Sequence, residues 1–349
     1  MSKTEKDNIT KFKIAVDAMG GDNAPLPEIQ GAVEAARQLG IPIILVGNEE
    51  KIGRELKKYK ISGLQIEVVH AEEAVGMDEL PSRAIRKKNS SIAIAVKLVK
   101  EKEAVAVVSA GSTGAVMACS LLGMGRLHNI SRPAIAAPMP TITGEQSILM
   151  DAGANMDCKP KNLLEFAIMG DVYARYVIGK KNPRIGLLSV GEEEYKGNDL
   201  AKQSYDLIKN APLNFIGNVE GREIVNGGAD VIICDGFTGN SILKFGEGLA
   251  EMIMTLLKKE LASGILSKFG TLLLSPAFNK FKKRVDYSEY GGAPLLGLKG
   301  LCIICHGSSS AKAIRNGIRV AHKFAVQRVN EHIHENFKLY EEKMGCLKE

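Results

Sequence analysis

The chain has 349 residues, of which 45% are hydrophobic and 25% charged, and its formal net charge is +6. This composition is ordinary for a soluble globular protein, and the length suits one extended α/β domain or two smaller ones. The excess of positive charge is too small to indicate a nucleic-acid partner by itself. With 5% aromatic residues and no Trp, we also expect no surface on which the bases of a single-stranded nucleic acid could stack.

The N-terminal segment MSKTEKDNITKFK is polar and lacks the apolar region of a secretory signal. We therefore expect a cytoplasmic protein in which residues 1–11 form a loose tail. No stretch reaches about 18 uninterrupted apolar residues, which argues against a membrane-spanning helix.

Short apolar runs then alternate with amphipathic stretches, the pattern of βα units around a largely parallel sheet. The first half predicts strands at 12–18, 41–47, 64–71 and 105–110, and helices at 26–40, after 47 as far as Lys60, 90–104 and 113–127. The second half predicts strands at 147–155, 184–191, 214–221, 230–236 and 300–307, and helices at about 160–180, 197–210, 240–262 and 308–335. We expect a single α/β domain over residues 12–340.

Six of the predicted strands end in small and polar residues. These corners are 16–25, 108–116, 150–157, 189–198, 234–241 and 305–312. In a parallel sheet all of them would lie at one carboxyl edge, where open α/β folds bind ligands. A single such corner is more often only a turn, but six glycine-rich corners followed by helices predict a site for phosphate or another anion. Their spacing matches neither a dinucleotide fingerprint nor a Walker loop.

The candidate phosphate and substrate ligands are the polar residues and glycines of these corners. They are Asp17, Gly20, Gly21, Asp22, Ser109, Gly111, Ser112, Thr113, Gly114, Asp151, Asn155, Gly239, Ser241, His306, Gly307 and Ser308. Carboxylates repel phosphate, so we expect the three aspartates to orient other groups rather than contact the anion. His306 is at least as readily explained as a hydrogen-bonded structural histidine.

We expect no cofactor and no metal. Cys302, Cys305 and His306 match the spacing of a c-type haem attachment. However, GLCIICHG is predicted to be a buried strand, in which residues three apart point to opposite faces and cannot share a ligand.

Residues 258–290 depart from the βα pattern and predict a protruding amphipathic helical hairpin. It would form a dimer interface or lie on an anionic membrane surface. The predicted contacts are Ile265, Leu266, Phe269, Leu272, Leu273, Phe278 and Phe281 on the apolar side and Lys282 and Lys283 on the basic side.

Several of these motifs resemble one bacterial family. KIAVDAMGGDNAP, SAGSTGA, LSVGEEEYKGN, DGFTGNSILK and HGSSSAKA are similar to the phosphate acyltransferases of phospholipid synthesis, in family order, from about Lys13 to the 330s. The resemblance implies transfer of a long-chain acyl group from the thioester of acyl carrier protein to inorganic phosphate, giving acyl phosphate. It also implies a homodimer, peripheral membrane attachment, a downstream glycerol-3-phosphate acyltransferase, and a three-layer, Rossmann-like fold related to phosphotransacetylases and isopropylmalate dehydrogenases.

The resemblance assigns catalysis to Lys196 and Asn240. Lys196 would hold phosphate and offset developing charge, and Asn240 would donate to the oxyanion or position phosphate. From spacing alone, a solvated loop lysine and a helix N-cap remain open. The sequence contains no G-x-S-x-G motif, which suits phosphate as a nucleophile that is already ionised at neutral pH.

A basic run at 83–88 has two readings. It is either a solvated helix start or, given the resemblance, a docking site for the acidic carrier protein through Arg83, Arg86, Lys87 and Lys88. The alternatives for the whole chain are a dehydrogenase or short-chain phosphotransacetylase on a related fold, or a membrane scaffold that binds carrier protein without turnover.

Overall fold

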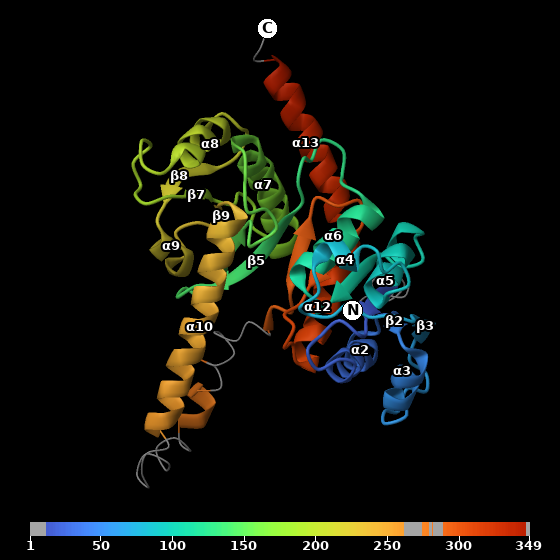
Figure 1. Cartoon of the computed structure of the whole chain (residues 1–349). Helices are drawn as coiled ribbons and strands as arrows, with labels where there is room; N and C mark the ends of the chain where they lie inside the picture. Colours follow the sequence, from blue (N-terminus) through green and yellow to red (C-terminus); the bar gives the residue numbers. More distant parts are fainter. Residues whose placement is uncertain (1–11, 262–273, 279–280, 282–288, 347–349) are drawn as a thin grey trace.

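The computed structural model describes residues 12–261, 274–278, 281 and 289–346 (Figure 1). In this part of the chain one sheet has eleven strands in the order β3-β2-β1-β4-β11-β10-β5-β6-β9-β7-β8. Helices cover both faces of the sheet, so the predicted three-layer α/β fold is confirmed. The predicted tail at 1–11 lies outside the described residues.

The first lobe consists of five parallel strands and the helices around them. The strands are β1 (Ile14–Asp17), β2 (Ile43–Gly47), β3 (Ile66–His70), β4 (Ala106–Ser109) and β11 (Leu301–Ile304). Ile14 and Val16 pack on one face with α2 (Leu26–Leu39) and α12 (Ala311–Val326). Ala15 points to the other face, towards α5 (Ser91–Lys100) and α6 (Thr113–Met124). The alternation of side chains along each buried strand therefore fixes both helical layers. The short helices α3 (Glu49–Leu56) and α4 (Pro81–Ala84) complete the lobe.

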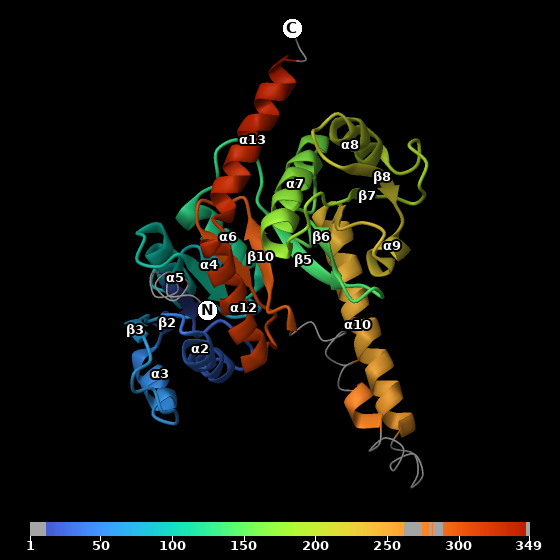
Figure 2. The ribbon, with the colours of Figure 1, turned by 180° about the vertical axis from the view of Figure 1, so that it is seen from behind.

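The second lobe has four parallel strands, β6 (Gln146–Met150), β9 (Val231–Ile233), β7 (Ile185–Leu188) and β8 (Phe215–Val219). One face packs on α7 (Pro160–Tyr173), which continues as a π-helical turn (Ala174–Ile178), and on α8 (Asp199–Lys209) and α13 (Val329–Cys346). Figure 2 shows α13 beside α7. The other face packs on α9 (Gly221–Asn226) and the start of α10 (Gly236–Leu261).

Two strands that the sequence did not predict join the lobes. These are β5 (Ala134–Pro140) and β10 (Ala293–Leu296). β10 is antiparallel to β11 and to β5, and β5 is antiparallel to β6. Consequently β6, β9, β7 and β8 run opposite to the strands of the first lobe. The prediction that all six corners share one carboxyl edge is therefore wrong, because it assumed one strand direction throughout.

Two smaller predictions have different outcomes. The helix expected at 308–335 is two helices, α12 and α13, separated at Arg328, whose φ of 50° lies in the left-handed region. Cys302 packs on the α5–α6 face and Cys305 on the α2–α12 face, so the argument against a shared ligand is confirmed.

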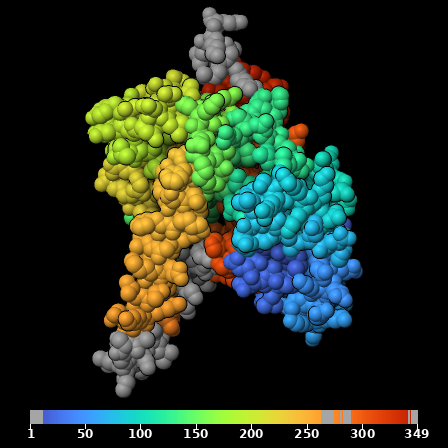
Figure 3. Space-filling model, viewed as in Figure 1, coloured from blue at the N-terminus to red at the C-terminus, as the bar shows by residue number. Residues whose placement is uncertain are grey.

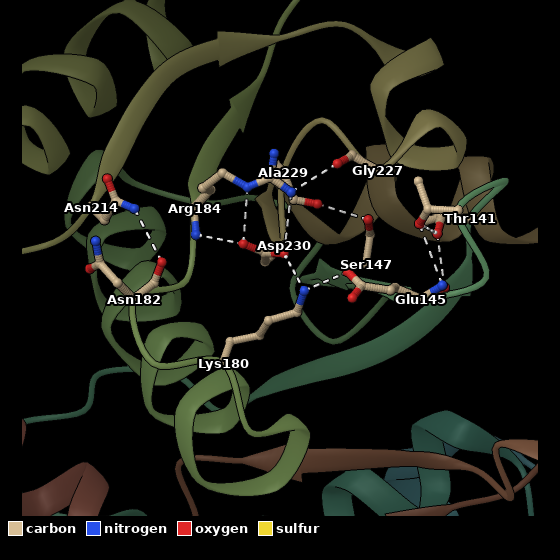
Figure 4. Close-up of polar contacts among 11 residues, drawn as sticks. Thr141, Glu145, Ser147, Lys180, Asn182, Arg184, Asn214, Gly227, Ala229 and Asp230 are labelled. Carbon is tan, nitrogen blue, oxygen red and sulfur yellow. Dashed lines mark hydrogen bonds and ion pairs between the residues drawn. The ribbon is translucent and has the colours of Figure 1, made fainter.

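An ionic network holds the amino ends of the second lobe's strands together (Figure 4). Asp230 accepts hydrogen bonds from the backbone N–H of Arg184 at 2.9 Å and from its Nε at 3.2 Å. Lys180 lies 3.2 Å from Asp230 and 2.6 Å from Glu145. Burial opposes ionisation of Asp230, but the hydrogen bonds from Arg184 and Lys180 leave its pKa lowered. The network therefore ties together the segments that precede β6, β7 and β9.

α10 leaves the body of the molecule (Figures 1 and 3). Its 26 residues span about 39 Å, and only Gly236 and Gly239 are buried. The exposed apolar side chains along it are Phe245, Leu249, Met252, Ile253 and Leu256. The excursion predicted from residue 258 thus starts earlier, within α10. Residues 274–278 form a short helix beside its far end, with Phe278 half-buried and Phe281 exposed. Ile265, Leu266, Phe269, Leu272, Leu273, Lys282 and Lys283 lie outside the described residues.

Candidate active site

Corners from both lobes meet at a cavity of about 140 Å³ that lies over the joining strands β5 and β10. We call it the inter-lobe cavity. Its polar lining includes Thr113 and His306 from the first lobe's corners and, from the second lobe, Asn240 and the ion pair between Lys244 and Glu247 at 2.8 Å. Although the strands of the two lobes run in opposite directions, the corners therefore come together where the lobes join.

The corners of β1 and β4 are organised by a buried carboxylate. Asp17 is 2% exposed, accepts a hydrogen bond from Ser109 Oγ at 2.7 Å, and accepts another from the N–H of Met19. Ser109 Oγ in turn accepts from the N–H of Gly111 at 3.1 Å. Burial raises the pKa of Asp17. A Cβ at Gly20 would lie 2.6 Å from Asp17 Oδ2, so the loop requires glycine there.

The N-terminus of α6 follows this loop and presents unpaired amides. Ser112, at the N-cap position, makes no capping hydrogen bond with its side chain. Among the described residues, the N–H groups of Thr113 and Gly114 have no recorded acceptor. Since Thr113 lines the inter-lobe cavity, this helix end offers it free donors and a partial positive charge.

The corner of β11 holds His306, Gly307 and Ser308. His306 Nδ1 lies 2.8 Å from Ser308 Oγ, and the backbone oxygen of Gly307 accepts from the N–H of Asp22 at 2.9 Å. Asp22 and Gly21 therefore approach this corner, and a Cβ at Gly21 would lie 3.3 Å from the Gly307 oxygen.

Ser309 is a residue that sequence reasoning missed. It is 4% exposed, lines the inter-lobe cavity, and its hydroxyl has no hydrogen-bond partner among the described atoms. In the run Ser308–Ser310 only burial distinguishes it, because Ser308 and Ser310 are exposed. The sequence carried no signal that would have found it.

Asp151 and Asn155 organise the corner of β6. Asp151 is fully buried and accepts from the N–H groups of Ile135, Ala154 and Asn155 at 2.9, 3.0 and 2.7 Å. Asn155 Nδ2 donates to Asp151 at 2.8 Å and to the backbone oxygen of Pro133 at 2.7 Å. Burial raises the pKa of Asp151. Both side chains hold backbone in place, and neither lines the inter-lobe cavity.

Asn240 lies inside α10 and not at its N-cap. Asp235 takes the capping role, because its carboxylate accepts from the N–H of Thr238 at 2.9 Å. The alternative that Asn240 merely caps the helix is therefore wrong. No hydrogen bond is recorded for its amide within the described residues, and it lines the inter-lobe cavity. Ser241 Oγ, in contrast, donates to the backbone oxygen of Phe237 at 2.8 Å. Gly239 packs so tightly that a Cβ would lie 1.9 Å from the backbone oxygen of Asp151.

Lys196 lies in the loop after β7, in the same lobe as Asn240. It is half-buried, and its Nζ lies 5.7 Å from the centre of the Tyr195 ring. Lys196 does not line the inter-lobe cavity. The two residues that follow it, Gly197 and Asn198, border a second cavity of about 340 Å³, which we call the apolar cavity.

The basic run borders the site. Arg83, Arg86 and Lys88 are exposed. Lys87 instead forms an ion pair with Glu79, with 2.7 Å between Lys87 Nζ and Glu79 Oε2. Pro81, the first residue of α4 and two residues before this run, packs on α6, since a Cβ at Gly114 would lie 2.9 Å from its Cγ. The charges are therefore displayed next to the helix end that faces the inter-lobe cavity.

Glu28 is a second residue without a clear sequence signal. It is 1% exposed, one of its carboxylate oxygens has no partner among the described atoms, and burial raises its pKa to about 7. A Cβ at Gly21 would lie 2.2 Å from Glu28 Oε1, so this acid supports the glycine loop. In the sequence it looks like any acid in the first turn of a helix.

Comparison with known proteins gives consistent results. Residues 12–332 match the family described as fatty acid synthesis protein. A phosphate acyltransferase of Geotalea uraniireducens is 55% identical over 342 residues, which cover 97% of this chain and 99% of the relative. One from Geobacter sulfurreducens is 52% identical over 343 residues, with 97% and 99% covered. Among solved structures, a Streptococcus pyogenes phosphotransacetylase superposes with a TM-score of 0.60 at 18% identity, covering 94% of this chain and all of that one, a likeness of fold.

Proposed function

Because the chain belongs to the fatty acid synthesis protein family, and its relatives are phosphate acyltransferases, we propose that it transfers a long-chain acyl group from acyl carrier protein to inorganic phosphate. The chain is an acyltransferase. The observation that best supports phosphate as acceptor is the lining of the inter-lobe cavity, where the α6 N-terminus, Asn240 and Ser309 converge. Uncharged donors and a helix N-terminus suit an anion, and the Glu247 carboxylate in the same lining is paired with Lys244 at 2.8 Å.

The proposed reaction is an attack of a phosphate oxygen on the thioester carbonyl. A C–O bond forms, the carbonyl oxygen becomes an oxyanion, and collapse breaks the C–S bond and releases the carrier thiolate, which takes a proton from water. Phosphate is already ionised near neutral pH, so positioning and charge compensation suffice. Asn240 donates to the oxyanion or to phosphate, and Lys196 offsets negative charge.

We place the carrier protein on the basic run. Arg83, Arg86 and Lys88 are exposed beside Leu80 and Ile85, which are 59% and 37% exposed. Exposed cations around apolar side chains suit an acidic protein that docks transiently. The carrier's thioester would then enter beside the α6 N-terminus.

We further propose a homodimer and attachment to an anionic membrane surface. The exposed apolar side chains of α10 recur at spacings of three and four residues from Phe245 to Leu256, which is the pattern of a helix that covers its face with a partner. The predicted hairpin beyond α10 would contact lipid. No helix within the described ranges is long and apolar enough to cross a bilayer. An acyl phosphate has a hydrophobic acyl chain and a reactive mixed anhydride. We therefore expect this product to be delivered at the membrane to a glycerol-3-phosphate acyltransferase.

The function is tested by incubating the protein with palmitoyl-[acyl carrier protein] and phosphate. Free carrier protein should appear only when phosphate is present, together with palmitoyl phosphate trapped as its hydroxamate. Equal release without phosphate would make the protein a thioesterase and refute the proposal. Efficient turnover of acetyl-coenzyme A instead would favour the short-chain phosphotransacetylase, and binding without release would favour the scaffold.

The dimer and the membrane contact are tested separately. Leu249→Glu plus Leu256→Glu should convert a dimer to monomers in sedimentation velocity, since each would bury a charge in the proposed interface. Thr255→Glu, on an exposed position of the same helix, is the control. Flotation with vesicles of phosphatidylglycerol and phosphatidylcholine measures lipid contact. If the unaltered protein does not float with these vesicles, the proposed membrane attachment is wrong.

A further inference from the structure

The apolar cavity lies between the carboxyl ends of β7 and β9 and the start of α8. Its volume of about 340 Å³ falls within the range of small-ligand sites. The walls are mostly hydrocarbon and include Leu163, Leu187, Leu188, Leu200, Ala201 and Cys234. Such a lining selects an apolar ligand group.

The polar side chains around this cavity are mostly committed to other partners. Asp235 accepts from Thr238 Oγ1 at 2.7 Å and from its N–H at 2.9 Å. Asn198 Oδ1 accepts from the N–H of Ala201 at 2.9 Å as the cap of α8. Ser189 Oγ alone in this lining is buried without a partner. One hydroxyl and one carboxylate would not hold a phosphate, because the carboxylate repels it.

The first turn of α10 separates the two cavities. Asp235 and Thr238 line the apolar cavity, while Asn240 lines the inter-lobe cavity. Gly239 lies between them and packs against the backbone of Asp151 with no space for a Cβ. Lys196 immediately precedes Gly197 on the rim of the apolar cavity. The two cavities therefore lie on the two sides of this turn, and the apolar cavity is the one lined mostly by hydrocarbon.

We propose that the apolar cavity holds the acyl chain of the thioester substrate and sets the preferred chain length. This inference rests on the proposed function, since it assigns the chain of the same substrate whose carbonyl is attacked beside Asn240. Val190 lines the cavity and is 81% exposed, so it marks the opening. Each methylene that is buried should raise kcat/KM about fourfold, until the cavity is full.

The test compares octanoyl, lauroyl and palmitoyl carrier-protein substrates. Leu188→Trp fills the cavity and should lower kcat/KM for palmitoyl at least tenfold more than for octanoyl. Leu200→Ala enlarges it and should shift the optimum to longer chains. Opposite shifts from filling and enlarging cannot arise from loss of stability. An equal fall for all three substrates would overturn the proposal.

Two controls keep the test decisive if Leu188→Trp folds poorly. Val190→Trp obstructs the exposed opening and should reproduce its selectivity, whereas Ile216→Trp, a partly exposed position on β8 outside the lining, should not. A carrier-bound acyl chain with a terminal diazirine should label peptides containing residues 187–201 upon irradiation. This labelling needs no turnover, so labelling without transfer would reject the function alone, and transfer with labelling elsewhere would reject the cavity assignment alone.

Discussion

Replacing Asn240 with alanine separates catalysis from folding. Its amide lines the inter-lobe cavity and has no recorded hydrogen bond within the described chain, so the substitution leaves no protein group unsatisfied. Loss of one donor to a developing oxyanion typically lowers kcat by about 10²–10³, equivalent to about 2.7–4 kcal/mol. The residue lies inside α10, where alanine is a better helix former than asparagine by about 0.5 kcal/mol. We therefore expect a large loss of turnover together with unchanged or slightly raised stability.

The assay is phosphate-dependent release of carrier protein from palmitoyl carrier protein, with thermal unfolding measured on the same samples. Asn336→Ala in α13 is the matched control, since Asn336 donates to the backbone oxygen of His332 at 2.8 Å and lines neither the inter-lobe cavity nor the apolar cavity. It should keep full activity and lose a little stability. If Asn240→Ala turns over within threefold of the unaltered protein, the amide is not a donor to the reacting atoms.

Three further outcomes are expected. Lys196→Ala should raise KM for phosphate and lower kcat, with partial recovery in Lys196→Arg; unchanged phosphate kinetics would remove its role. Arg83→Glu plus Arg86→Glu should lower kcat/KM for the carrier substrate at low ionic strength, and the loss should shrink in high salt; an equal loss with acyl-pantetheine, which has no carrier, would exclude docking. The pKa of Glu28 is raised from 4.5 to about 7, so the folded state holds a proton that the unfolded state loses, and stability falls by about 3 kcal/mol as pH rises between these values. Glu28→Gln should therefore be more stable than the unaltered protein at pH 8 and nearly equal to it at pH 4.5 in urea unfolding, and a constant difference across pH would contradict this.

The sequence predicted most of the strands because each is a short apolar run bounded by turn residues. Val231–Ile233 and Leu301–Ile304 lie inside their predicted ranges, and α10 ends within one residue of its predicted end. The two strands are buried in the sheet, so local hydrophobicity was sufficient to predict them.

The sequence could not predict the strands that join the lobes. β5 contains Pro138 and Pro140 and β10 contains Pro294, and proline within an apolar run argues against a strand. Both strands pair antiparallel with near neighbours in the chain, β5 with β6 and β10 with β11, but the pairing of β5 with β10 that joins the lobes connects segments far apart in the chain. Their absence from the prediction made one continuous parallel sheet the natural expectation, and that expectation placed all the corners on one edge. The meeting of the corners over β5 and β10 follows from tertiary pairing that no local pattern encodes.

Hydrogen bonding decides which corner residues can bind a ligand: a side chain that already pairs with the backbone is not available, and one without a partner is. Asp17 at the end of β1 and Asp151 just after β6 accept from backbone N–H groups of the loops that follow, and Asp235 caps the first turn of α10. Loops of this kind must satisfy their buried amides, and a carboxylate does so without another strand. With the aspartates committed to the backbone, the Asn240 amide and the Ser309 hydroxyl remain directed at the inter-lobe cavity. That division suits an anion, which needs donors, and the carboxylate of Glu247, which also lines this cavity, is paired with Lys244 at 2.8 Å. The same sequence pattern thus contains two sets of residues, and only burial and hydrogen bonding distinguish those that shape the loop from those left to bind.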